Sequence, residues 1–276
     1  MDRNKRQLGL RGLLDKLTPT EENSLEKRNS SAILYNVVGF LAASDFADNG
    51  ALISNLGCML SERGLNTCIV DFKVFFPTLY NYLDLTENEK GKGLLTVLRD
   101  DKVDIREHIN QTKYKQLYLL SPSPYDLIEE YLDFSFEHIE LLIDQIKDIF
   151  DLVLIDIPND PALEFCLGAM KYVHRGFMTV SERIESITNV TKLLDFASSI
   201  GITTSKFTNL IFVNTQDMNF DYGALKETNY KVVANLPLVR GVIEEYFKGN
   251  IYVKHSSIFN RQYIAGMNEL VNIIVS

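Results

Sequence analysis

Residues that hold metals or cross-link chains are scarce in this sequence. Its 276 residues include 3 cysteines, 4 histidines and no tryptophan. The cysteines lie far apart among apolar neighbours and form no Cys-x-x-Cys pair, so we expect small buried thiols in a reducing compartment. The histidines are equally scattered, and none has a metal ligand at a useful spacing. We therefore expect no metal site.

Long apolar runs and an excess of basic residues are also missing. No apolar stretch approaches the roughly 18 residues that a membrane-spanning helix needs, and the first residues lack the apolar core of a signal peptide, so we expect a cytoplasmic protein. The 28 basic residues are outnumbered by 37 acidic ones, which gives a net charge of −9. Because contacts to a phosphate backbone need a basic face, we expect no nucleic-acid partner.

From residue 32 onward, short apolar runs alternate with amphipathic stretches, among them an expected helix from Phe134 to Phe150 and another from about Arg261 to Ile274. The apolar runs are nearly continuous, which is typical of strands buried on both faces of a parallel sheet. We therefore expect one α/β domain over residues 32–276, a doubly wound, mostly parallel sheet with helices on both faces. It should have about seven strands, near residues 32–42, 67–72, 116–120, 151–158, 176–180, 209–214 and 231–237.

Two of the apolar runs end in an aspartate, Asp71 in IVDF and Asp156 in VLIDIP. In a doubly wound sheet, ligands bind outside the carboxyl ends of the central strands, where these residues should lie. An apolar run followed by aspartate is typical of the carboxylates that hold metal and water in nucleotide hydrolases. The alternative is that both aspartates only cap turns at strand ends.

Three longer segments occur in a fixed order: VDFKVFFPTLYNYL at residues 70–83, GKGLLTVL at 91–98 and FDLVLIDIP at 150–158. With them the chain resembles the MinD/ParA family of deviant P-loop ATPases, within the SIMIBI class, over about residues 32–275. The resemblance implies a P-loop NTPase fold. It also implies that Asn214, in LIFVN, occupies the position of the family's adenine-contacting asparagine.

The phosphate loop is where the chain departs from this family. The family loop, K-G-G-x-G-K-[ST]-[ST], aligns with SDFADNGA at residues 44–51, which has neither lysine and none of the loop glycines. The family's second aspartate of the D-x-D segment is Lys73 here. A phosphate cradle needs backbone N–H groups and a cation, and Asp45 and Asp48 would repel a polyanion. The degenerate loop positions of interest are Ser44, Asp45, Asp48, Asn49 and Gly50.

These departures predict a pseudo-ATPase with no catalytic residues and no bound cofactor. In this interpretation Asp71, Asp156 and Asn214 are the remaining positions of a former nucleotide site. The alternative is an ATP-binding ATPase that holds ATP with Mg²⁺ through an unusual loop and acts as a positioning switch.

The first 31 residues differ from the rest, with a basic, leucine-rich stretch and then a polar linker at residues 18–31. Residues 1–17 carry five basic and two acidic side chains. The helical spacing of their leucines predicts one apolar face that contacts an anionic membrane surface or a partner's groove. The residues expected at this contact are Leu10, Leu13, Leu14, Leu17, Arg6 and Arg11. The alternatives are a frayed tail and a helix that packs on its own domain.

A scaffold without chemistry would act by recruitment. Among the family's members, those that tolerate degenerate phosphate loops resemble TadZ/CpaE, localisation factors of pilus assembly. We therefore expect protein partners, a homodimer as one of them, and a role in pilus or secretion assembly or in cell-pole positioning. The aromatics Phe75, Phe76, Tyr80 and Tyr82 fall near the family's dimer face and belong either to the core or to an interface.

Overall fold

The structure is a computed structural model that describes residues 33, 35–43, 49–85, 92–159, 163–216, 229–256 and 259–276. Within these residues, eight strands form one sheet in the order β3-β4-β2-β5-β1-β6-β7-β8. The strands are β1 Val37–Ala42, β2 Thr67–Asp71, β3 Asn110–Gln111, β4 Leu117–Leu120, β5 Leu152–Ile157, β6 Arg175–Val180, β7 Asn209–Val213 and β8 Lys231–Leu236. All neighbours pair in parallel except β3 and β4. The expected doubly wound sheet is confirmed, and the seven expected strands are joined by the short β3.

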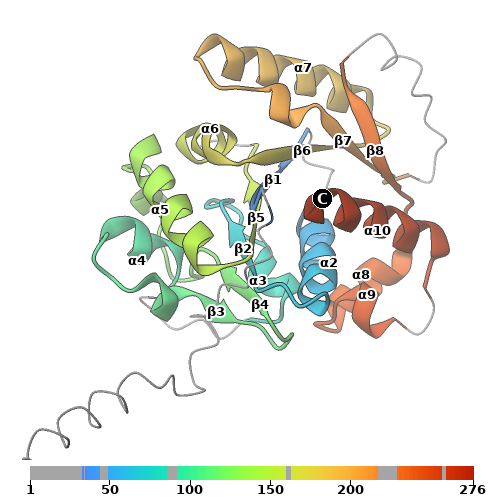
Figure 1. Cartoon of the computed structure of the whole chain (residues 1–276), viewed down its shortest axis with the longest axis horizontal. Helices are drawn as coiled ribbons and strands as arrows, with labels where there is room; N and C mark the ends of the chain where they lie inside the picture. The colour runs from blue at the N-terminus through green and yellow to red at the C-terminus, as the bar shows by residue number, and fades with distance from the viewer. Residues whose placement is uncertain are drawn as a thin grey trace, which may run out of the picture.

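Helices cover both faces of the sheet. The α-helices are α2 Asn49–Glu62, α3 Leu79–Tyr82, α4 Leu94–Arg99, α5 Phe136–Ile149, α6 Leu163–Tyr172, α7 Ile184–Ser199, α8 Arg240–Phe247, α9 Tyr252–His255 and α10 Arg261–Val275. Short 3₁₀ turns are η2 Ile105–His108, η3 Ile128–Tyr131 and η4 Ser205–Phe207. One apolar core joins the sheet to α4, α5, α6 and α7, and a second joins the other face to α2, α3, α9 and α10. In Figure 1, α4 and α5 lie to the left of the central strands and α2 and α10 to the right.

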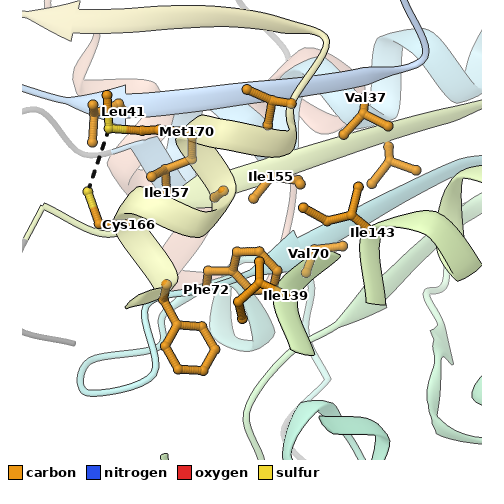
Figure 2. Close-up of a cluster of buried hydrophobic side chains, with 14 of the residues drawn as sticks. Val37, Leu41, Val70, Phe72, Ile139, Ile143, Ile155, Ile157, Cys166 and Met170 are labelled. Carbon is orange, nitrogen blue, oxygen red and sulfur yellow. Dashed lines mark hydrogen bonds between the residues drawn. The ribbon is translucent and has the colours of Figure 1, made fainter. Parts of the chain in front are cut away.

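The first core shows why these residues form these elements. Every residue of β5 is buried, because helices cover the strand from both sides. On α5 the buried residues recur at helical spacing, with Ile139, Leu142, Ile143 and Ile146 on one face. Figure 2 shows Ile139 and Ile143 among the side chains of β2 and β5. At about 1.5–3 kcal/mol for each fully buried aliphatic side chain, this face alone is a large stabilising term.

Several smaller expectations can be compared with the structure. The helices expected at residues 134–150 and 261–274 are observed at Phe136–Ile149 and Arg261–Val275. The three cysteines are buried thiols, as predicted, and none of them is part of a disulfide. Among the described residues, no helix is both long and apolar enough to cross a bilayer. The segment predicted to contact a membrane or partner lies outside the described residues; it contains Leu10, Leu13, Leu14, Leu17, Arg6 and Arg11. The boundary expected between residues 31 and 32 lies outside them as well.

Candidate functional site

The carboxyl ends of β1, β2, β5 and β6 meet at one edge of the sheet and carry a cluster of buried polar side chains. The β2–β5 register pairs Asp71 with Asp156, and both residues are fully buried. The sequence placed both residues at this edge of the sheet, and the parallel register brings them side by side. Ser44, Asp45 and Asp48 of the expected degenerate phosphate loop lie outside the described residues.

Asp156 has a positive charge within ion-pairing distance. The Nζ atom of Lys73 lies 3.2 Å from Oδ2 of Asp156, and the lysine side chain is only 17% exposed. The other carboxylate oxygen, Oδ1, accepts a hydrogen bond of 3.3 Å from Nδ2 of Asn49. A buried carboxylate is costly unless it is paired and hydrogen-bonded, and here it is both. Lys73 therefore neutralises the charge of Asp156.

Asn49, the first residue of α2, ties this helix to three strands. Besides Asp156, its Nδ2 donates to the carbonyl oxygen of Phe40 in β1 at 3.2 Å. Its Oδ1 accepts from Oγ1 of Thr179 in β6 at 2.6 Å. Asn49 is fully buried, and its amide has partners on both its oxygen and its nitrogen. The network fixes the start of α2 against the ends of β1, β5 and β6.

Asp71 organises the loop that follows β2. Its Oδ1 accepts from the backbone N–H of Lys73 at 3.0 Å, and its Oδ2 accepts from those of Thr78 and Leu79 at 3.1 and 3.2 Å. Burial raises the pKa of Asp71 to about 7, with a further contribution from the neighbouring Asp156. Lys73 and the backbone N–H donors act in the opposite direction. In this structure Asp71 has the turn-capping role that the sequence left as an alternative.

The described residues do not fit a magnesium site built on Asp156. A metal bound at this carboxylate would have to displace the ammonium group of Lys73 or stand beside it, and two cations so close repel each other. Gly50 lies at the position of the family's metal-binding hydroxyl, is buried within α2 and offers no side-chain ligand. Asn49, at the position of the family lysine, points into the network of Thr179 and Asp156.

Asn214 belongs to a different part of the molecule. It follows β7, where its N–H donates to the carbonyl oxygen of Leu236 at 2.9 Å and its Oδ1 accepts from the N–H of Gln216 at 3.2 Å. It also lines a cavity of about 420 Å³ between α2, α8 and the ends of β7 and β8. The other lining residues are mainly apolar or aromatic and include Leu52, Val213, Leu236, Val239, Tyr246 and Tyr263. An apolar cavity with one amide is suited to a flat, weakly polar ring.

Sequence reasoning missed the contacts that define the cluster. Lys73 was noted as a departure from a family pattern, but its pairing with Asp156 was not foreseen. Thr179 was not singled out, although it is the second-to-last residue of the run GFMTV, at the edge where the aspartates were expected. Of the aromatics considered, Phe75 packs partly buried against the first core and Tyr80 against the second, whereas Phe76 is 70% exposed.

Comparisons with solved structures find MinD and ParA proteins. The septum site-determining protein MinD of Pyrococcus horikoshii, complexed with Mg-ADP, superposes with a TM-score of 0.72 at 16% identity, over 87% of this chain and 95% of that one. A ParA family ATPase from Chlorobium tepidum gives 0.69 at 16% identity, over 90% and 99%. The MinC:MinD cell division protein complex of Aquifex aeolicus gives 0.69 at 15%, over 87% and 96%.

No family model matches the sequence, and no curated protein matches it either. The structural likeness therefore establishes the fold: this chain has the α/β fold of the MinD and ParA structures, as its sequence segments predicted.

Proposed function

We propose that this chain is a non-catalytic, MinD/ParA-like scaffold that recruits and positions partner proteins. The observation that carries the proposal is the Lys73–Asp156 ion pair, with 3.2 Å between Nζ and Oδ2. A nucleotide hydrolase of this fold needs the strand-end carboxylate for metal and water, and here a lysine of the same chain compensates it. A built-in cation gives the site a fixed charge balance that does not change with ligand.

The sequence of the adjoining loop supports the same conclusion. Residues 44–49 contain two aspartates and no lysine. Two like charges about 4 Å apart repel by about 4 kcal/mol at an effective dielectric constant of 20, so each aspartate would oppose a bound polyphosphate. The attraction that two loop lysines would supply is missing as well. We infer that the protein needs no cofactor.

The partners in this proposal are proteins. One structural neighbour is described as a MinC:MinD cell division protein complex, so this fold can carry a partner protein in a relative of similar shape. We propose a comparable role here, in pilus or secretion assembly or in cell-pole positioning, with a homodimer as the simplest assembly. Leu10, Leu13, Leu14 and Leu17, with Arg6 and Arg11, would attach the scaffold to the inner face of a membrane or to a partner.

One observation favours a second candidate function. The cavity of about 420 Å³ beside Asn214 lies next to the first turn of α2. A structural neighbour is described as complexed with Mg-ADP. In this alternative the chain binds ATP with Mg²⁺ through an unusual loop and acts as a positioning switch. Such binding would require Lys73 to leave Asp156.

A calorimetric titration with ATP and Mg²⁺, combined with a phosphate-release assay, separates the two functions. We expect no binding heat and no turnover above background from the full chain. Steady turnover that Asp156→Asn abolishes would overturn the scaffold proposal and support the switch. The matched control is Asp151→Asn, which lies immediately before β5, at the end of the strand opposite to Asp156, and should leave any turnover intact. A pull-down with the untagged native protein then identifies its partners.

A further inference from the structure

The segment between β4 and α5 presents an apolar surface of unusual composition. Within residues 125–132, the side chains of Tyr125, Leu127, Ile128 and Leu132 are each 48–62% exposed. They cannot be explained as a loosely held loop. Tyr131 of η3 is 2% exposed, and its hydroxyl donates to Oδ2 of Asp126 at 2.6 Å. The segment is thus anchored to the core while four large apolar groups face outward, which marks a surface that contacts something else.

The charged residues of this segment are all acidic. Residues 122–134 contain four carboxylates, at Asp126, Glu129, Glu130 and Asp133, and no basic residue. Glu130 pairs with Arg99 at 2.8 Å, and Asp126 accepts from Tyr131 and from the backbone of Ser123. Glu129 and Asp133 are exposed beside the apolar groups. We call residues 125–133 the acidic apolar surface. It matches a ligand that is apolar on one face and basic at its flanks.

This chain itself contains such a ligand. We propose that the acidic apolar surface binds residues 3–17 of the same chain, with the leucine face on the apolar side chains and the basic residues near Glu129 and Asp133. The segment has four leucines at helical spacing and five basic residues. An anionic membrane surface would be repelled by the same carboxylates, so this part of the molecule is a poor lipid contact. The cavity beside Asn214 is lined by uncharged residues and offers the basic side chains no partner.

The tether is long enough for this contact. The described chain resumes just before β1, and β4 lies three strands away through β5 and β2. The path from the start of β1 to the end of β4 therefore covers about 20 Å along the strands, the length of a six-residue strand, and about 14 Å across three strand spacings. Fifteen residues, 18–32, span up to about 50 Å when extended. Because a contact within one chain is intramolecular, with an effective concentration that can reach the millimolar range, a weak contact suffices to keep the segment docked.

The inference goes beyond the proposed scaffold function and does not depend on the loss of ATPase activity. A docked segment keeps its leucines from any membrane or partner, so the acidic apolar surface would hold recruitment off until a competing ligand takes the segment.

Photo-crosslinking in the full chain tests the contact. Leu13 is replaced by the apolar photoreactive residue benzoylphenylalanine, and the crosslinked peptide is mapped by mass spectrometry. We expect crosslinks to residues 122–134, with a yield that is independent of protein concentration and falls at least tenfold in Leu132→Lys. Leu141→Lys, at an exposed leucine of α5 (52% against 59% for Leu132), is the matched control and should leave the yield unchanged.

Each other outcome overturns the proposal. Crosslinks to the cavity at residues 236–247, or to no part of the chain, would show that the segment does not dock on the acidic apolar surface. A crosslink between two chains whose yield falls on dilution would assign the surface to a second copy. Circular dichroism confirms that each variant is folded, and Leu132→Ser repeats the test without adding charge. Recruitment is assayed separately by vesicle flotation and pull-down, so the scaffold function can fail while the docking holds, or the reverse.

Discussion

At the scale of single residues, the ion pair between Lys73 and Asp156 determines how stable the site is. We predict that Lys73→Met lowers the free energy of unfolding by about 3 kcal/mol, because it leaves a fully buried carboxylate without its ammonium partner. Urea unfolding followed by circular dichroism measures the change. The control is Lys147→Met, whose partner Asp144 is exposed and whose loss should cost less than about 1 kcal/mol. Equal effects of the two substitutions would contradict the assigned role of Lys73.

Asp71 makes the stability depend on pH in an unusual direction. Its pKa in the folded protein is raised to about 7 from 3.8, so between these values the folded state holds a proton that the unfolded chain releases. Stability therefore falls as the pH rises from about 4 to about 7. We predict that Asp71→Asn removes this part of the slope and lowers stability by about 1–3 kcal/mol, since one N–H loses its acceptor. Unfolding free energies of both proteins at pH 5, 6 and 7 test this, and parallel curves would refute it.

At the scale of elements, the N-terminal segment should be separable from the fold. We predict that deletion of residues 1–17 leaves the melting temperature within a few degrees and disperses the protein from its membrane or partner. Leu13→Glu should act like the deletion, because it puts a charge on the leucine face, while Asn4→Glu, off that face, should have a weaker effect. Thermal scans and fluorescence microscopy of tagged full-length variants report both results. A loss of tens of degrees on deletion would place the segment in the core.

The elements themselves could be predicted from the sequence where burial is on both faces. Runs such as LVLIDI are nearly all apolar because helices cover both sides of the sheet, so β5 was expected near residues 151–158 and is observed at Leu152–Ile157. The short β3 was missed because Asn110 and Gln111 are polar edge residues that pair with β4 only through the backbone. The meeting of Asp71 and Asp156 followed from parallel topology. The contacts of Lys73 with Asp156 and of Thr179 with Asn49 could not be predicted in this way, because a contact between side chains of different strands leaves no periodic pattern in the sequence.

At the scale of the whole molecule, a site with its own cation should make assembly independent of nucleotide. The carboxyl edge of the sheet carries Lys73 and, on the loop after β2, Phe76 with 70% of its side chain exposed. Because Lys73 already neutralises Asp156, no triphosphate is needed to balance the charge at this edge. The exposure of Phe76 does not depend on a nucleotide either. We predict that the sedimentation coefficient at each protein concentration is the same with and without ATP and Mg²⁺.

Because the net charge is −9, self-association should also depend on the salt concentration. Two copies repel each other at low salt, and the repulsion is screened beyond about 10 Å at 0.1 M ionic strength, so association should increase as salt is added. If Phe76 lies in the interface between two copies, Phe76→Ser reduces the association, whereas Phe196→Ser on α7, at 45% exposure, leaves it unchanged. Sedimentation velocity at 0.05, 0.15 and 0.5 M salt measures all three proteins. A dimer that forms only after ATP is added would show that nucleotide still bridges the subunits and that Lys73 gives way to it.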